Sequence, residues 1–231
     1  MNPIVKRQIE KLNDCITKSI LKKVKDKKKI LLTLSGGHDT RVVLSILLKN
    51  NIHFHAVTIR FSKGDIKIAK RICKDLELHH YIYNDISIEK KWQMVDELKK
   101  NYDILLVGTG FSEWMCALHK LYMSYNKLKE HNTEYIERTL KDECYSPMSE
   151  WDCINIIKDI PIVYLAGGYI QKELIKMNYP KLLKYPFTYF DWRHWLMNKF
   201  YPHIVDFIYN SYFREKGRNY FESKKEKKRW K

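Results

Sequence analysis

The chain has 231 residues, 45% of them hydrophobic and 30% charged, so it can bury a substantial core in one large domain or in a domain with an appendage. No apolar run reaches the roughly 20 residues of a membrane helix, and the N-terminal segment lacks the apolar core of a signal peptide, which argues against a membrane partner and favours the cytoplasm. The formal net charge of +16 favours anionic partners such as nucleic acid or nucleotides, although lysine-rich coding bias explains the same excess.

The first half of the chain alternates between helical and extended patterns. Apolar residues at helical spacing predict an amphipathic helix over residues 4–24. The apolar run 30–34 predicts a buried strand, and 39–49 predicts a largely buried helix. The further elements that we predict, in chain order, are a strand at 53–59, a helix that follows Asp65, a strand at 79–84, a helix at about 86–100, a strand at 103–107 and a helix from about 111.

This alternation is typical of βαβ units and predicts an α/β fold, a doubly wound parallel sheet with helices on both faces. Ligands of such sheets bind beyond the carboxyl ends of the strands. The sequence Ser-Gly-Gly follows the first predicted strand and Gly-Thr-Gly follows the fourth. We therefore expect both glycine-rich turns at the ligand-binding edge of the sheet.

The alternation weakens after about residue 130. Residues 159–177 fit either a strand, a Gly-Gly turn and a helix, or one interrupted helix. Aromatic and basic residues crowd 185–221, and we expect the C-terminal portion to be mainly helical. The predicted organisation is a nucleotide-binding α/β core at 1–130, a mainly helical part at 131–221 that completes the substrate side, and a basic, disordered tail at 222–231.

The five cysteines are widely spaced and form no C-x-x-C pair. This spacing argues against a zinc ribbon and against a dithiol redox motif. Because free cysteines are among the most buried residues of proteins, we expect buried thiols.

The segment "LSGGHDTR" (34–41) carries the clearest chemical signal. Two glycines directly after a buried strand let a ligand approach the main chain, and successive N–H groups at a helix N-terminus bind anions such as an oligophosphate. Asp39 would repel phosphate unless a cation lies between them, which indicates Mg²⁺. The alternative is a tight strand-to-helix turn with Asp39 as the helix N-cap. Neither the Walker A pattern nor G-x-G-x-x-G is present after this strand.

This segment resembles the pyrophosphate-binding SGGxDS/T loop of the PP-loop ATP pyrophosphatases, which have an adenine nucleotide alpha-hydrolase-like fold. Within that superfamily the chain is most similar to the synthetase domain of asparagine synthetases. The resemblance covers residues 30–115 and, more weakly, 185–218. The segments that carry it downstream are "DIKIAKRICKDLELHHYIY", "ILLVGTGFSEW", "YPFTYFDWRHWLMNKFYP" and "FREKGR".

The resemblance implies a set of site residues. The implied nucleotide-binding positions are Ser35, Gly36, Gly37, His38, Thr40 and Arg41 in the loop, Thr58, Ile59, Arg60 and Phe61 against the adenine, and Asp65, Gly108, Thr109 and Gly110 around them. It implies catalytic roles for Asp39, Glu113 and Lys216, with Asp39 and Glu113 as the metal ligands. Four of these residues also have an ordinary structural interpretation. An acid in the first turn of a helix would explain Asp65 and Glu113. A pair with an acid would explain Arg41, and a surface position would explain Lys216.

The resemblance implies an enzyme that uses ATP and Mg²⁺, adenylates a small carboxylate or amide, releases pyrophosphate and transfers the product to an amine or ammonia. In the family's G-x-G-x-D-E motif, Ser112 stands where the second metal-binding acid is expected. The chain begins Met-Asn, without the N-terminal cysteine of a glutaminase, so we expect free ammonia or a separate glutaminase as nitrogen source.

Two other functions remain open. The positive charge and the aromatic, basic segment 185–221 also fit a PP-loop enzyme that modifies tRNA or binds another nucleic acid. Ser112 fits a nucleotide-binding protein with impaired catalysis.

Overall fold

The computed structural model describes residues 3–59, 63–83, 97–98, 100–108, 144–161, 164–165 and 168–187. Its strands are β1 (Ile30–Thr33), β2 (His55–Ile59), β3 (His80–Tyr83), β4 (Ile104–Leu106) and β5 (Cys144–Tyr145). Its α-helices are α1 (Pro3–Val24), α2 (Asp39–Lys49), α3 (Lys63–Asp75), α8 (Trp151–Lys158) and α9 (Tyr169–Asn178). Two short 3-10 helices are η1 (Pro147–Ser149) and η3 (Pro180–Lys184).

The five strands form one parallel sheet in the order β3-β2-β1-β4-β5. From β1 the chain passes to β2 and β3 on one side, and later strands add to the other side. The strand order therefore reverses beside β1, which is the place where open α/β sheets bind ligands. The predicted doubly wound parallel sheet is confirmed.

Burial on both faces explains the apolar run that forms β1. Ile30 and Leu32 face the larger core cluster, whereas Leu31 belongs to a smaller cluster with Val57 and Leu105. Alternate residues of a strand point to opposite faces, so a central parallel strand is apolar throughout rather than alternating.

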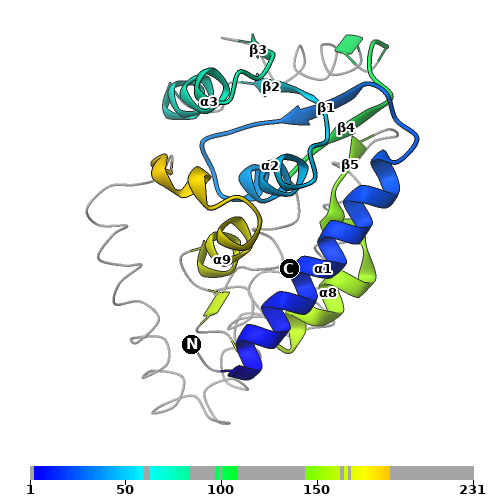
Figure 1. Ribbon diagram of the computed structural model, residues 1–231, viewed down its shortest axis with the longest axis vertical. Coiled ribbons are helices and arrows are strands. Elements are labelled where there is room, and N and C mark those ends of the chain that lie inside the picture. Colours follow the sequence, from blue (N-terminus) through cyan, green and yellow to red (C-terminus); the bar gives the residue numbers. More distant parts are fainter. Residues whose placement is uncertain are drawn as a thin grey trace, which may run out of the picture.

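The helices on one side of the sheet build the larger core. Helix α2 contacts β1 and α9, and α1 contacts α8 and α9, as Figure 1 also shows. Helix α1 is amphipathic as predicted, and its buried apolar residues are Val5, Ile9, Leu12, Ile16, Ile20 and Val24. No helix in the described part of the chain is long and apolar enough to cross a membrane.

The observed elements differ from the predicted ones in three places. Helix α3 begins at Lys63, so Asp65 lies within its first turn rather than before it. Residues 159–161 and 164–165 are not extended, and α9 begins at Tyr169, so no strand precedes this helix among the residues described there. Strand β5 was not predicted, because two residues are too few for a detectable pattern. The domain limits stay predictions.

Candidate functional site

The Ser-Gly-Gly loop joins β1 to α2 at the carboxyl edge of the sheet. Its start is fixed to β2, because the Leu34 N–H donates to the Val57 carbonyl (2.8 Å) and the Thr58 hydroxyl donates to the Leu34 carbonyl (2.7 Å). Thr58 Oγ1 also lies 2.8 Å from His80 Nε2 on β3. Thr58, predicted beside adenine, thus supports the loop in this structure.

Two hydroxyl groups close the loop on itself. The Ser35 N–H donates to Thr40 Oγ1 (3.1 Å), and the two side-chain oxygens also lie 3.1 Å apart. The Gly37 N–H donates to Ser35 Oγ (3.1 Å). Hydroxyls and N–H groups that gather at one helix N-terminus can exchange these contacts for the oxygens of an anion.

Asp65 reaches into the loop from the first turn of α3. The Gly36 N–H donates to Asp65 Oδ1 (2.8 Å), and Asp65 is only 6% exposed. Asp65 therefore both starts its helix and contacts the predicted nucleotide loop. Because its carboxylate already accepts from Gly36, that N–H is directed at protein rather than at the loop opening.

Arg41 is fully buried beneath the loop. Its Nη2 donates to the Gly36 carbonyl (2.8 Å) and to the Pro186 carbonyl, and its Nη1 donates to the Tyr185 carbonyl (2.9 Å). Burial lowers its pKa to about 10, and the Asp65 charge opposes that shift. These contacts favour a structural role, in which Arg41 fastens the segment after η3 to the back of the loop.

His38 sits between this segment and α9. Its ring stacks on Phe187 with centroids 3.7 Å apart, and the Arg41 guanidinium carbon lies 4.1 Å from the centroid of the same phenyl ring. Burial first, then the charges of Lys172 and Arg41, lowers the pKa of His38 to about 3, so the imidazole is neutral at pH 7. Its buried Nε2 has no hydrogen-bond partner among the described residues.

Two glycines make these close contacts possible. Gly168 has φ +69°, and a Cβ there would lie 3.0 Å from His38 Nε2. A Cβ on Gly108, after β4, would lie 2.6 Å from the Thr40 nitrogen, so this turn rests directly on the start of α2. The two glycine-rich turns were predicted to lie at the same edge of the sheet, and Gly108 does lie against Thr40 of the first turn. The other residues of the second turn, Thr109 and Gly110, lie outside the described ranges.

Asp39 lies in the first turn of α2, where its Oδ1 accepts from Gln171 Nε2 (3.3 Å) on α9. It does not occupy the N-cap position, which His38 holds. No group of three His, Cys, Asp or Glu side chains suited to a metal occurs within the described ranges. One carboxylate combined with phosphate oxygens still suits Mg²⁺, which needs few protein ligands.

Several predicted residues cannot be placed, and others were missed. The predicted residues that lie outside the described ranges are Arg60, Phe61, Thr109, Gly110, Ser112, Glu113 and Lys216. Ile59 is the last residue of β2 and is half-buried. Three residues beside the loop were not among the predicted site residues. Gln171 hydrogen-bonds Asp39, Phe187 stacks on His38, and the charge of Lys172 lowers the pKa of His38. The sequence signals near them are the Gly-Gly pair at 167–168 and the segment that begins Tyr185-Pro186-Phe187.

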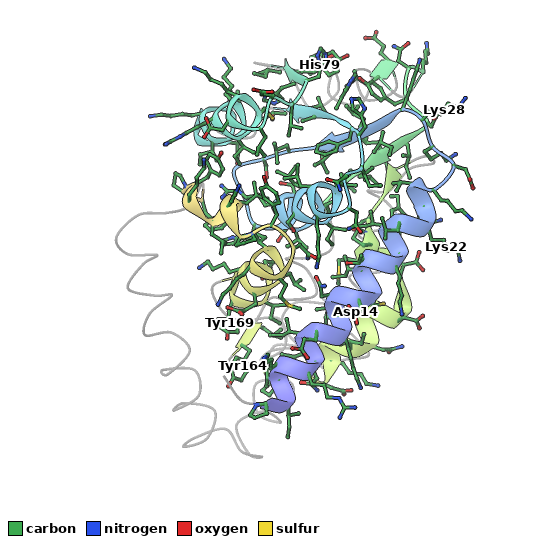
Figure 2. The ribbon with its side chains drawn as sticks, viewed as in Figure 1. Asp14, Lys22, Lys28, His79, Tyr164 and Tyr169 are labelled. Atoms are coloured by element: carbon green, nitrogen blue, oxygen red, sulfur yellow. The ribbon has the colours of Figure 1, made fainter. Side chains whose placement is uncertain are left out.

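A second polar cluster lies at the opposite, amino edge of the sheet. His55 Nδ1 lies 2.6 Å from the Tyr102 hydroxyl, which donates to the Tyr81 hydroxyl (3.1 Å). The His79 ring lies 4.5 Å from that of His55 and 4.6 Å from that of Tyr81, centroid to centroid. Figure 2 shows His79 beside β3, away from α2 and α9. We call His55, His79, Tyr81 and Tyr102 the amino-edge cluster.

The fold and the loop together define an α/β protein with a hydroxyl-lined Ser-Gly-Gly turn at the switch point of a parallel sheet. No protein-family model matches the chain. It is 28% identical over 97 residues, 42% of its length, to the tRNA-specific 2-thiouridylase MnmA 1 of Fusobacterium nucleatum. The match spans a quarter of that relative's length.

Among solved structures, the chain matches the NMN synthetase of Francisella tularensis at 14% identity and a TM-score of 0.32. That match covers 87% of this chain and 94% of the other.

Proposed function

We propose that this protein is an ATP-dependent enzyme that transfers AMP to an oxygen of its substrate and releases pyrophosphate. The observation that carries the proposal is the Ser-Gly-Gly loop at the carboxyl end of central strand β1, where the hydroxyls of Ser35 and Thr40 meet at the N-terminus of α2. A loop of this kind binds phosphate oxygens through hydroxyls, N–H groups and the helix dipole.

The residues of the loop have distinct roles in this proposal. Ser35, Thr40 and the Gly37 N–H leave their mutual hydrogen bonds and donate to the departing pyrophosphate. Arg41 and Asp65 hold the Gly36 backbone in place from behind. Phosphoryl and nucleotidyl transfer need little covalent help from protein, so positioning and charge neutralisation provide most of the rate.

Asp39 is the described residue that would hold Mg²⁺, with Glu113 as a second proposed ligand and Lys216 as a proposed cation at the phosphates. The metal would neutralise phosphate charge. Lys172 adds a half-buried positive charge close to His38, and burial lowers its pKa. It is therefore a further candidate for contact with an anionic group.

The specific reaction that we propose is of the asparagine-synthase-like type: adenylation of a small carboxylate or amide, followed by attack of an amine or ammonia. The motivation is the set of sequence segments downstream of the loop, including Pro186-Phe187, which the structure places against Arg41 and His38. A separate glutaminase could supply the ammonia.

Pyrophosphate release from ATP and Mg²⁺, measured across a panel of small acids with ammonia, tests this proposal. The variants S35A and T40A should release pyrophosphate roughly tenfold to a hundredfold more slowly, because each loses a hydroxyl that donates to the developing charge on pyrophosphate. S45A is the matched control, since that hydroxyl donates to the Val42 carbonyl within α2. Equal loss in all three variants, or no release from folded wild type with any acid, would count against the proposal.

A second candidate is a PP-loop enzyme that adenylates a tRNA base. The similarity to a tRNA-specific 2-thiouridylase favours it. So does the amino-edge cluster, whose Tyr102 directly precedes Asp103, the carboxylate that accepts from the N–H groups of Lys28 and Lys29. Rings suited to base stacking beside positive charge are typical of single-strand binding surfaces. Pyrophosphate release that depends on added tRNA, and not on any small acid, would select this candidate.

A third possibility is a nucleotide-binding protein with impaired catalysis. Binding and release assays distinguish it from the two enzymes. Calorimetric ATP binding that S35A weakens, without any release of AMP or pyrophosphate, would support it.

A further inference from the structure

Two cysteine sulfurs that are far apart in the sequence nearly touch in the fold. Cys15 on α1 and Cys153 on α8 are separated by 138 residues, and their Sγ atoms lie 2.9 Å apart. A disulfide bond is about 2.05 Å long, so closure requires an approach of about 0.9 Å. Neither side chain is bonded to another cysteine in the described structure.

Hydrogen bonds on either side of Cys15 keep its side chain directed at Cys153. One turn beyond Cys15 on α1, the Ser19 hydroxyl hydrogen-bonds the Tyr145 hydroxyl at the end of β5. Two turns before it, Gln8 Nε2 donates to the Asp159 carbonyl at the end of α8 (3.1 Å). Positions separated by four and seven residues share one helix face, so α1 cannot easily rotate Cys15 away from Cys153.

The two thiols differ in access to solvent. Cys153 is fully buried, and burial, assisted by Cys15, Glu150 and Asp152, raises its pKa. Cys15 is only partly buried. A soluble oxidant therefore meets Cys15 first, and Cys153 reacts only across the short sulfur–sulfur gap.

We propose that Cys15 and Cys153 form a disulfide site, closed by exchange with a small-molecule disulfide such as oxidised glutathione. The Cys15 thiolate attacks one glutathione sulfur, forms a mixed disulfide and expels one glutathione thiolate. Cys153 then loses its proton to water, attacks Cys15 Sγ and expels the second glutathione thiolate. Two cysteines are oxidised as one glutathione disulfide is reduced to two thiols.

Closure links α1 to α8 across a segment that contains all five strands of the sheet. A cross-link over so long a loop restricts the unfolded chain strongly and therefore stabilises the fold. The site is independent of the proposed ATP chemistry, because neither cysteine contacts the Ser-Gly-Gly loop in any described interaction.

The test uses the full chain, incubated with oxidised or reduced glutathione, then alkylated, digested and analysed by mass spectrometry. We expect a peptide pair joined through Cys15 and Cys153 in the oxidised sample. We also expect the midpoint of thermal unfolding to rise by roughly 10 °C over the reduced sample. C15S should lose the joined peptides and the rise, whereas C144S, which alters another half-buried cysteine, should retain both.

Wild-type peptide mapping tests the proposal even if C15S does not fold. A stable glutathione adduct on Cys15 beside an alkylated Cys153 would overturn it. So would a disulfide to any other cysteine, or equal unfolding midpoints of the oxidised and reduced protein.

Discussion

At the scale of single residues, the loop is held by a buried charge. The Arg41 guanidinium supplies hydrogen bonds to three backbone carbonyls, of Gly36, Tyr185 and Pro186. Buried carbonyls that lose their donors cost about 1–3 kcal/mol each, and lysine cannot reproduce the planar fork of donors. Arg41 therefore contributes stability and loop geometry together.

We predict that R41K and R41M lower the free energy of unfolding by roughly 3 kcal/mol or more, measured by urea denaturation. The control is R7M, which removes an exposed arginine from α1 and should change that free energy by less than about 0.5 kcal/mol. A result in which R41M is as stable as R7M would contradict the anchoring role.

The low pKa of His38 predicts how the stability of the fold depends on pH. Its folded pKa of about 3 lies below the ordinary 6.5, so the unfolded chain binds more protons between these values. The stability from neutral, buried His38 is fully present above pH 6.5 and is lost as pH falls toward 3, at about 1.4 kcal/mol per unit when steepest. His80, whose pKa burial lowers to about 4, adds a slope of the same sign.

The variant H38F keeps an aromatic ring against Phe187 and removes the titration. We expect its free energy of unfolding to depend less steeply on pH than that of wild type between pH 6.5 and 4, measured by denaturant titrations at each pH. Parallel slopes for the two proteins would contradict the assignment.

At the scale of elements, α9 is positioned by a single glycine. Gly168 precedes the helix in the left-handed conformation and lies against the His38 ring. We predict that G168A costs about 1–3 kcal/mol in thermal or chemical unfolding, because alanine disfavours this backbone and its Cβ meets the ring. G64A, in the first turn of α3 and without positive φ, should be neutral or slightly stabilising. Equal effects of both substitutions would contradict this account.

The elements also show what sequence alone can reveal. The runs that form β1, α2 and β4 are apolar enough to identify. The Ser-Gly-Gly turn marks the candidate site, because glycines directly after a buried strand let a ligand approach the main chain. The sequence does not reveal that Arg41 turns inward or that Phe187 stacks on His38, because both contacts join residues about 145 positions apart. The same holds for Cys15 and Cys153, for which the sequence predicts buried thiols but not their proximity.

At the scale of the whole molecule, the parallel sheet has two chemically different edges. The carboxyl edge holds the hydroxyl-lined loop, and the amino edge holds the amino-edge cluster beside residues 27–29. The net charge of +16 acts on both by attracting anions.

If the tRNA candidate holds, tRNA binding should weaken linearly on a plot of log affinity against log salt, with a steep slope set by the number of phosphates contacted. The double variant H79A/Y81A should weaken binding by roughly tenfold without altering ATP affinity, because it removes two rings from the amino edge. Filter binding at several salt concentrations measures the salt slope and the tRNA affinity of the variant, and calorimetry measures its ATP affinity. Absence of tRNA binding at low salt would exclude this candidate.

The measurement that tests the central claim most directly is a crystal structure of the protein with ATP and Mg²⁺. We predict phosphate oxygens bound by the Gly37 N–H and by the hydroxyls of Ser35 and Thr40, with Asp39 at the metal and the Arg41 contacts unchanged. A nucleotide bound elsewhere, with the Ser35–Thr40 contact still closed, would contradict the account.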